Sequence, residues 1–175
     1  MDRKDFVRDS KEDDIYIDYP KPLSYGQTIS QPSTVAMMLE MLQPQKGDKV
    51  LDIGSGSGWT TALLGHIVTQ DGSVTGLERI PELVIFAKKN LEKYNLKQVH
   101  IEQAKESLGI KDQKFDRILV SAAANEFPLE LVKQLKINGK LVVPVKNTIY
   151  EITKKENEEL DIIEHYGFRF VPLVV

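Results

Sequence analysis

Apolar stretches with strand character alternate with amphipathic stretches through the middle of the chain. Strand signals cover residues 49–53, 74–78, 99–102 and 115–121. Helical spacing of apolar positions covers residues 60–68, 81–94 and 129–136. Such alternation predicts an α/β protein in which right-handed crossovers connect parallel strands and helices cover both faces of the sheet.

The end of the chain breaks this alternation. Strand signals at residues 140–145 and 149–154 are separated by only three residues, which is too short for a crossover helix. These two strands should therefore pair antiparallel, and residues 160–171 supply a final strand, bent at Gly167. The sequence predicts a seven-stranded, mostly parallel sheet with antiparallel C-terminal strands.

The first third of the chain is different. Residues 1–18 are charge-dense and are expected to be poorly ordered, and residues 19–32 read as a loop interrupted by prolines. Helical spacing at residues 33–42 follows, with Pro32 suited to the first turn. We expect all 175 residues to form one domain.

Residues 50–58, VLDIGSGSG, place three glycines at alternate positions between a strand and a helix. Glycine tolerates positive φ and lets the backbone approach a ligand closely. The sixth position of a dinucleotide fingerprint is Trp59 here, so that motif is not matched. The spacing instead resembles the nucleoside pocket of S-adenosylmethionine-dependent methyltransferases; the alternative is an ordinary tight strand-to-helix turn.

Two acids end neighbouring predicted strands, Asp52 and Glu78. In an open α/β sheet both would lie at the carboxyl rim, where ligands bind. Glu78 can accept both ribose hydroxyls, although alone it could equally be a surface carboxylate. Asp52 can orient the loop and meet the cationic end of a methionine moiety. Residues 103–109 and 121–128 form two further loops that converge on this rim; the alanines of the second would admit a substrate or simply pack.

Composition narrows the function. The net charge is −3 without a basic stripe, which argues against a duplex nucleic-acid footprint, and no block typical of a flipped-base pocket is present. No apolar stretch approaches the ~20 residues of a membrane span, and the charged and polar residues 1–14 are not expected to form a secretory signal. With no cysteine and three scattered histidines, a metal site is not expected. We expect a cytoplasmic monomer.

Four separated blocks resemble the protein-L-isoaspartate (D-aspartate) O-methyltransferase family in its order. They are residues 26–32 (GQTISQP), 50–58 (VLDIGSGSG), 138–145 (NGKLVVPV) and 168–174 (FRFVPLV). The first and last are the most diagnostic, because neither belongs to the general cofactor fold. The resemblance implies a Rossmann-like methyltransferase fold with S-adenosyl-L-methionine as cofactor.

The resemblance also implies the reaction. These enzymes methylate the α-carboxylate of L-isoaspartyl residues in damaged proteins or peptides, and the ester then collapses to a succinimide that can reopen to aspartate. Ser30 matches the catalytic hydroxyl, with Thr28 beside it; without the family match, Ser30 would read as a helix cap. The predicted cofactor-binding residues are Gln27, Thr28, Ser30, Asp52, Gly54, Ser55, Gly56, Gly58, Glu78, Arg79, Lys105 and Glu106.

Three departures from the family pattern keep other functions open. Ala104-Lys105-Glu106 replaces the usual Gly-Asp-Gly at the adenine, where Glu106 could substitute if the loop shifts. Because only about twenty-five residues precede the first block, we expect the family's N-terminal helices to be largely missing, and residues 23–25 (LSY) replace a more usual Ile-Gly-x. The alternatives are a methyltransferase with a different acceptor and a non-catalytic cofactor-binding module.

Overall fold

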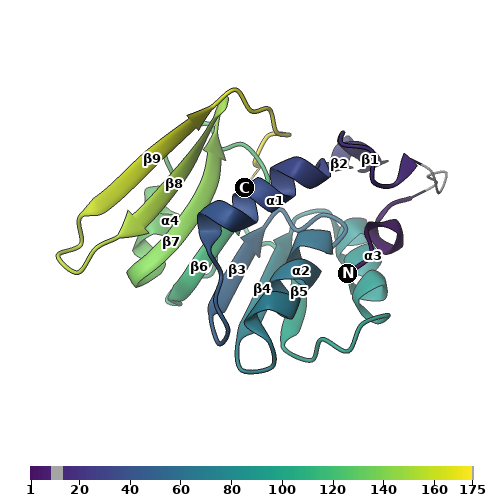
Figure 1. Ribbon diagram of the computed structural model, residues 1–175, viewed down its shortest axis with the longest axis horizontal. Coiled ribbons are helices and arrows are strands. Elements are labelled where there is room, and N and C mark those ends of the chain that lie inside the picture. The colour runs from purple at the N-terminus through teal and green to yellow at the C-terminus, as the bar shows by residue number, and fades with distance from the viewer. Residues whose placement is uncertain (9–13, 175) are drawn as a thin grey trace.

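The computed structural model describes residues 1–8 and 14–174 and is built on one seven-stranded sheet (Figure 1). In space the strands run in the order β5-β4-β3-β6-β7-β8-β9. Their bounds are β3 Lys49–Ile53, β4 Ser73–Glu78, β5 Val99–Gln103, β6 Phe115–Val120, β7 Leu135–Val145, β8 Thr148–Lys154 and β9 Leu160–Tyr166. The strands from β5 to β7 pair parallel, and β7–β8 and β8–β9 pair antiparallel, which confirms the predicted sheet.

Helices cover both faces of the sheet, as predicted. They are α1 Pro32–Leu42, α2 Trp59–Val68, α3 Pro81–Leu91 and α4 Leu129–Lys133. The alternation of side chains along β3 separates the two layers, since Val50 packs with Leu64 of α2 and Leu51 packs with Leu131 of α4. Figure 1 shows α1 and α2 in front of the sheet and α4 behind it. Within the described residues, no helix combines the length and apolar character that crossing a membrane requires.

The topology places the expected ligand site at the carboxyl end of β3. The chain leaves β3 for β4 and β5 on one side and returns to β6 on the other side, so the order of strands reverses between β3 and β6. Ligands of open α/β sheets bind beyond the carboxyl ends of the strands at such a switch point. The loops after β3, β4 and β6 therefore surround the expected site.

The prediction of an irregular loop over residues 19–32 was wrong. Lys21–Ser24 (β1) and Gln27–Ile29 (β2) form an antiparallel hairpin. Its two-residue turn places Tyr25 and Gly26 at φ 55° and 72°, as type I′ hairpin turns require. Pro22 is compatible with this small sheet because a two-stranded hairpin has only edge strands. The prolines concealed the turn signal.

Two boundaries near the C-terminus also differ from prediction. The helix predicted at 129–136 ends at Lys133, because β7 begins at Leu135 and continues through Asn138, whose φ of 61° produces an irregular register. The final strand ends at Tyr166 rather than continuing to 171. Gly167 has a φ of 95° and leads the chain out of the sheet, so residues 168–174 follow a separate path.

Residues 1–8 differ from the expectation of poor order. Arg3–Phe6 forms a 3-10 helix (η1), and both Arg3 and Phe6 are completely buried. Phe6 belongs to a core cluster with Trp59 and Leu83, which joins this segment to α2 and α3. The charged sequence therefore contains two anchoring residues. Positions 14–18 of the same expectation are described too, with Ile15 buried, whereas positions 9–13 lie outside the described residues.

Candidate active site

The loop after β3 has the conformation that its glycines predict. Gly54, Gly56 and Gly58 have φ values of 76°, 53° and 86°, where a side chain would introduce strain. The backbone N–H groups of Gly54 and Ser55 both donate to the carbonyl oxygen of Leu77, at 2.9 and 3.0 Å. The loop is therefore held against the end of β4.

Helix α3 packs against this loop. A Cβ atom at Gly58 would lie 3.2 Å from the Cβ of Ala87, so the loop and helix are in close contact. Asn90, which is buried, donates from Nδ2 to the carbonyl oxygen of Ser57 at 2.9 Å. Sequence reasoning missed Asn90, because a single asparagine in an amphipathic helix gives no signal of its burial.

A cavity of about 220 Å³ opens at the carboxyl rim, and we call it the donor cavity. The predicted residues that line it are Gln27, Thr28, Gly54, Gly56, Glu78 and Arg79. Residues that were not assigned to the site complete it: Ile53, Leu77, Ile80, Ala104, Ser121, Ala122 and Val171 to Val174. Polar groups thus lie along β4 and the hairpin, and the rest of the lining is largely apolar.

Glu78 is the acidic group of the donor cavity. It is 7% exposed, and its two carboxylate oxygens accept from the backbone N–H groups of Gly56 and Ile80, both at 2.9 Å. Each carboxylate oxygen can accept a second hydrogen bond. Glu78 is therefore fixed in place with acceptor capacity remaining for a ligand in the cavity.

Asp52 lies beneath the loop rather than in the lining of the donor cavity. It is completely buried, and its Oδ2 accepts from Thr61 Oγ1 of α2 at 2.6 Å, while Oδ1 has no partner within the described structure. Burial raises the pKa of the Asp52 carboxyl to about 7, the Thr61 hydrogen bond opposes that rise and the Glu78 charge adds to it. Asp52 is thus joined to α2, and it is not among the residues that line the donor cavity. Its role in orienting the loop stays a prediction.

A second cavity of about 250 Å³ adjoins the first, and we call it the acceptor cavity. Ser30, Thr34 and Arg169 contribute polar side chains to it. It shares Thr28, Ser121 and Val171 with the donor cavity. A smaller hollow of about 30 Å³ joins Ser30 to Ser55 and the glycines.

Ser30 is not the cap of α1. The residue at the N-cap position is Gln31, and the N–H of Ser33 is satisfied by Asp18 Oδ1 at 2.9 Å. The capping alternative for Ser30 therefore does not apply here, and its position in the lining of the acceptor cavity is the relevant one.

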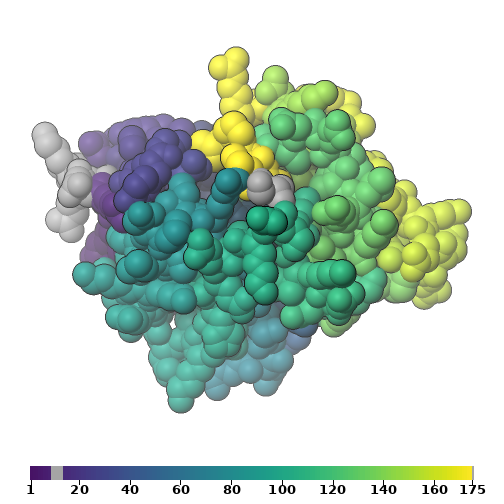
Figure 2. All heavy atoms as spheres, turned by 180° about the vertical axis from the view of Figure 1, so that it is seen from behind, coloured from purple at the N-terminus to yellow at the C-terminus, as the bar shows by residue number. Residues whose placement is uncertain are grey.

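The C-terminal segment forms the wall between the two cavities. Ala123 N–H donates to Val171 O, and Leu173 N–H donates to Ala123 O, both at 2.8 Å. Figure 2 shows the C-terminal residues, in yellow, between the purple residues of the N-terminal part and the green residues of the sheet. Sequence reasoning identified this block as diagnostic but read it as sheet, so its contribution to the site was missed.

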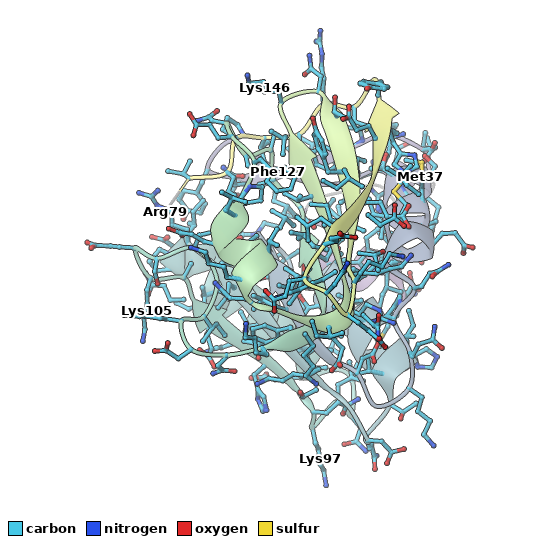
Figure 3. The ribbon with its side chains drawn as sticks, turned by 90° about the vertical axis from the view of Figure 1, so that its left-hand side faces the viewer. Met37, Arg79, Lys97, Lys105, Phe127 and Lys146 are labelled. Atoms are coloured by element: carbon cyan, nitrogen blue, oxygen red, sulfur yellow. The ribbon has the colours of Figure 1, made fainter. Side chains whose placement is uncertain are left out.

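Five predicted cofactor-binding residues lie outside the lining of both cavities: Asp52, Ser55, Gly58, Lys105 and Glu106. Ser55 borders only the smaller hollow. Lys105 and Glu106 are exposed, and Ala104 occupies the lining at the end of β5 instead. Figure 3 shows Lys105 and Arg79 on the same flank of the molecule. Gly58 shapes the loop through its contact with Ala87 rather than facing the cavity. In the described part of the chain, no cluster of acidic and histidine side chains could hold a metal ion.

The arrangement can hold two ligands side by side. The donor cavity offers a fixed carboxylate and close backbone approach, which suit a hydroxyl-bearing nucleoside. The acceptor cavity offers hydroxyl donors and the Arg169 cation, which suit an anion. Neither cavity contains a histidine, so the site is equipped for positioning two reactants more than for proton transfer.

Comparison with known proteins agrees with this geometry. The protein-L-isoaspartate O-methyltransferases of Pyrococcus horikoshii and Methanopyrus kandleri are 43% and 40% identical to the chain, over 97% and 98% of it and 79% of each relative. A crystal structure of a Plasmodium falciparum protein described as a protein-L-isoaspartate O-methyltransferase, in complex with S-adenosyl-L-homocysteine, superposes with a TM-score of 0.86 at 30% identity. That match covers 98% of this chain and 85% of the other.

The family model described as protein-L-isoaspartate(D-aspartate) O-methyltransferase matches residues 1–175. The family predicted from four sequence blocks is thus confirmed over the whole chain: the protein belongs to the protein-L-isoaspartate(D-aspartate) O-methyltransferases.

Proposed function

We propose that the protein transfers a methyl group from S-adenosyl-L-methionine to the α-carboxylate of L-isoaspartyl residues in damaged proteins and peptides. The observation that carries this proposal is the pair of adjoining cavities with the shared lining residues Thr28, Ser121 and Val171. At this boundary the donor cavity, which suits a nucleoside, adjoins the acceptor cavity, which suits an anion. Methyl transfer to a carboxylate requires such a meeting point, because donor and acceptor must approach in line.

The residues present fit the cofactor. Glu78 supplies carboxylate oxygens, each accepting one backbone hydrogen bond, which leaves acceptor capacity for two ribose hydroxyls. The positive-φ glycines leave no side chain between the loop backbone and the cavity, and Ala104 offers a small apolar surface where an adenine would lie. When bound, S-adenosyl-L-methionine supplies an activated methyl group on a positively charged sulfur.

The acceptor side holds an anion in place. We assign to the Ser30 hydroxyl a hydrogen bond donated to the acceptor carboxylate, with Thr28 beside it at the boundary of the two cavities. Arg169, exposed at the same cavity, attracts the negative charge of the isoaspartyl group. No covalent serine intermediate is needed, because a carboxylate is already a nucleophile.

The apolar lining contributes by excluding water. Ala122, Val171 and Leu173 border the donor cavity close to the shared boundary. A carboxylate that enters this region exchanges part of its hydration for fixed hydrogen bonds, which increases its reactivity toward an electrophilic carbon. The chain thus acts through orientation and partial desolvation.

The direct test is methyl transfer to a peptide that contains one isoaspartyl residue, with the aspartyl isomer as the matched control. We expect labelled methyl only in the isoaspartyl peptide, as an ester that mild base releases. Equal labelling of both peptides, or of neither, would overturn the proposal. A base-stable product would favour the alternative of a different acceptor group.

We also propose that the protein meets these substrates in the cytoplasm as a monomer. The proposal rests on the cysteine-free sequence with its modest net charge of −3. Light scattering across a concentration series tests the assembly state, and a constant mass above that of one chain would contradict it. Fractionation of the source cells tests the location.

A further inference from the structure

A completely buried arginine lies beside the segment that carries Ser30. Arg3, in the first turn of η1, has an exposed fraction of 0%. Its Nη2 donates to Ser30 O at 3.0 Å and to Tyr19 O at 3.2 Å, and its Nη1 donates to Ile15 O. The guanidinium therefore joins carbonyl groups from three places in the chain, and one of them belongs to the predicted catalytic residue.

The same segment contacts the donor side. The Arg3 guanidinium carbon lies 5.5 Å from the ring centroid of Trp59, within the range of a cation–π contact. Trp59 is the first residue of α2 and directly follows the glycine loop. Its indole N–H donates to Met1 O at 3.3 Å. Residues 1–3 thus lie between the helix that follows the cofactor loop and the loop that carries Ser30.

Burying an arginine here is unfavourable for the stability of the fold compared with burying an apolar residue. Removing a cation from water is unfavourable, and a buried charged group is often replaced by apolar residues without loss of stability. The planar guanidinium, however, holds several donors in one fixed geometry, which neither lysine nor an apolar residue reproduces. The free-energy cost of burying Arg3 is explained if the protein needs the three carbonyl groups held in one fixed arrangement.

We propose that Arg3 is a positioning residue for the reaction: it fixes the Ser30 loop relative to the cofactor loop. It acts through the Ser30 backbone and touches neither substrate. This inference rests on the proposed function for its kinetic consequence, but the ordering of residues 28–31 by Arg3 can be measured without any substrate.

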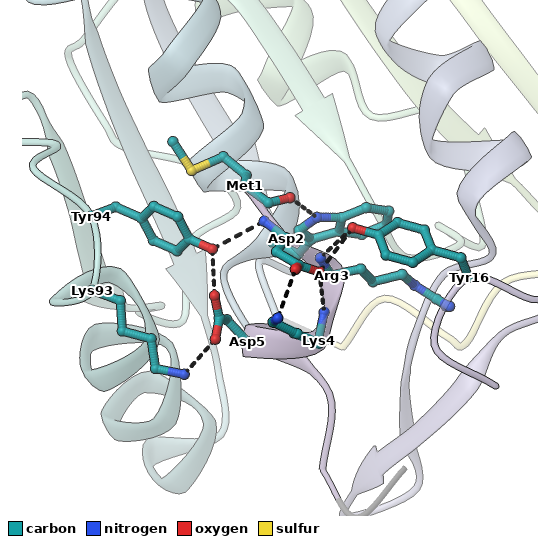
Figure 4. A network of polar contacts seen from close by, with 9 residues as sticks. Met1, Asp2, Arg3, Lys4, Asp5, Tyr16, Lys93 and Tyr94 are labelled. Carbon is teal, nitrogen blue, oxygen red and sulfur yellow. Dashed lines mark hydrogen bonds and ion pairs between the residues drawn. The ribbon is translucent and has the colours of Figure 1, made fainter. Parts of the chain in front are cut away.

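A variant of a residue that contacts η1 from beyond the end of α3 provides a matched control. Tyr94 accepts from Asp2 N–H at 3.0 Å and donates to Asp5 Oδ2 at 2.6 Å, so Tyr94→Phe loosens η1 without touching Ser30 (Figure 4). The test compares Arg3→Met, Arg3→Lys and Tyr94→Phe with the unmodified chain. For each we would measure kcat and KM with an isoaspartyl peptide, calorimetric affinity for S-adenosylhomocysteine, and amide hydrogen exchange.

We expect Arg3→Met to lower kcat about tenfold, with the affinity for S-adenosylhomocysteine within twofold of the original. Arg3→Lys should recover part of the loss, and Tyr94→Phe should leave kcat within twofold. Combining Arg3→Met with Ser30→Ala should lower kcat little more than Ser30→Ala alone, because both act through one hydroxyl. Amides 28–31 should exchange faster in Arg3→Met while amides 54–58 do not.

Several results would overturn the inference. One is an equal loss of kcat in Arg3→Met and Tyr94→Phe. Another is a double variant, Arg3→Met with Ser30→Ala, whose loss of kcat equals the product of the two single losses. A third is an equal rise in the exchange rates of amides 28–31 and amides 54–58 in Arg3→Met. If Arg3→Met does not fold, Arg3→Lys takes its place in every comparison. An unmodified chain that fails to methylate the peptide would refute the proposed function, and hydrogen exchange would still decide this inference.

Discussion

The two halves of the site are built in different ways. The glycine loop and Glu78 of the donor half come from one stretch of chain, residues 50–80, where β3, α2 and β4 follow one another, and more distant segments complete the cavity lining. The acceptor half joins the hairpin, the loop after β6 and the C-terminal segment, and the first and last of these lie more than 100 residues apart in sequence. Local sequence can specify the glycine loop and Glu78, whereas the acceptor half exists only when the whole sheet has formed.

Hydrogen bonding reflects the same difference. The glycine loop is held by hydrogen bonds to Leu77 and Glu78 at the end of β4 and by Asn90 of α3. The acceptor half depends on contacts between distant segments, such as Ala123 with Val171 and Arg3 with Ser30. Variants in the donor half should therefore change cofactor binding alone, and variants in the acceptor half should change turnover or peptide binding alone.

The largest expected effect is that of Glu78→Ala. The change removes two acceptor oxygens from the donor cavity and leaves the N–H groups of Gly56 and Ile80 without them. At ~1.5–3 kcal/mol for each hydrogen bond to a charged group, affinity for S-adenosylhomocysteine should fall at least about 100-fold. Calorimetry measures this loss, with exposed Glu102→Ala on the next strand as the control. Equal affinities of the two variants would contradict the assignment.

Asp52→Asn should change the pH dependence of stability. Because the pKa of Asp52 is raised from 3.8 to about 7, the folded protein retains a proton that the unfolded chain releases between those values. The free energy of unfolding should therefore fall as pH rises from about 4 to 7, by as much as about 4 kcal/mol, since each pKa unit corresponds to ~1.4 kcal/mol.

Urea unfolding at pH 4.5 and pH 8 checks this prediction. The Asp52→Asn variant should lack this part of the fall in the free energy of unfolding, because it carries no ionisable group at position 52. Parallel profiles for the two proteins would show that Asp52 does not titrate in this range in the folded state.

Ser30→Ala should lower kcat about 10- to 100-fold, which corresponds to one hydrogen bond to a charged group, while affinity for S-adenosylhomocysteine stays unchanged. Steady-state kinetics with the isoaspartyl peptide measure the loss. Ser33→Ala is the control, because Ser33 is an exposed serine of the same region outside the acceptor cavity. A loss of cofactor affinity equal to the loss of kcat would remove the distinction between the halves.

The smallest effect is expected from Arg169→Ala. Arg169 is exposed, so water and salt screen its charge, and KM for the peptide should rise about fivefold with kcat unchanged, which is roughly 1 kcal/mol. The rise should shrink in high salt. Lys97→Ala removes an exposed cation that lines neither cavity and serves as the control (Figure 3). If both variants raise KM equally, the effect is one of net charge.

The sequence predicted the donor half well for a physical reason. Alternating hydrophobicity and the glycine spacing are local signals, and β3 was found at its observed bounds, Lys49–Ile53. The hairpin at residues 21–29 was missed, because its turn is Tyr25-Gly26 rather than a typical Asn-Gly, and prolines flank it.

Long-range contacts explain the other misses. The burial of Arg3 depends on carbonyl groups at Ile15, Tyr19 and Ser30, and nothing in the local charge pattern indicates that they converge. The entry of Val171 into the site depends on Gly167 leaving the sheet, a change of direction that apolar spacing does not encode. The residues that were missed are those whose roles come from segments far away in the sequence.

A crystal structure with S-adenosylhomocysteine and an isoaspartyl peptide tests the central claim most directly. We expect the ribose hydroxyls on Glu78, the sulfur at the boundary formed by Thr28, Ser121 and Val171, and the α-carboxylate within hydrogen-bond distance of the Ser30 hydroxyl. A nucleoside bound away from Glu78, or a carboxylate held on the far side from Ser30, would contradict it.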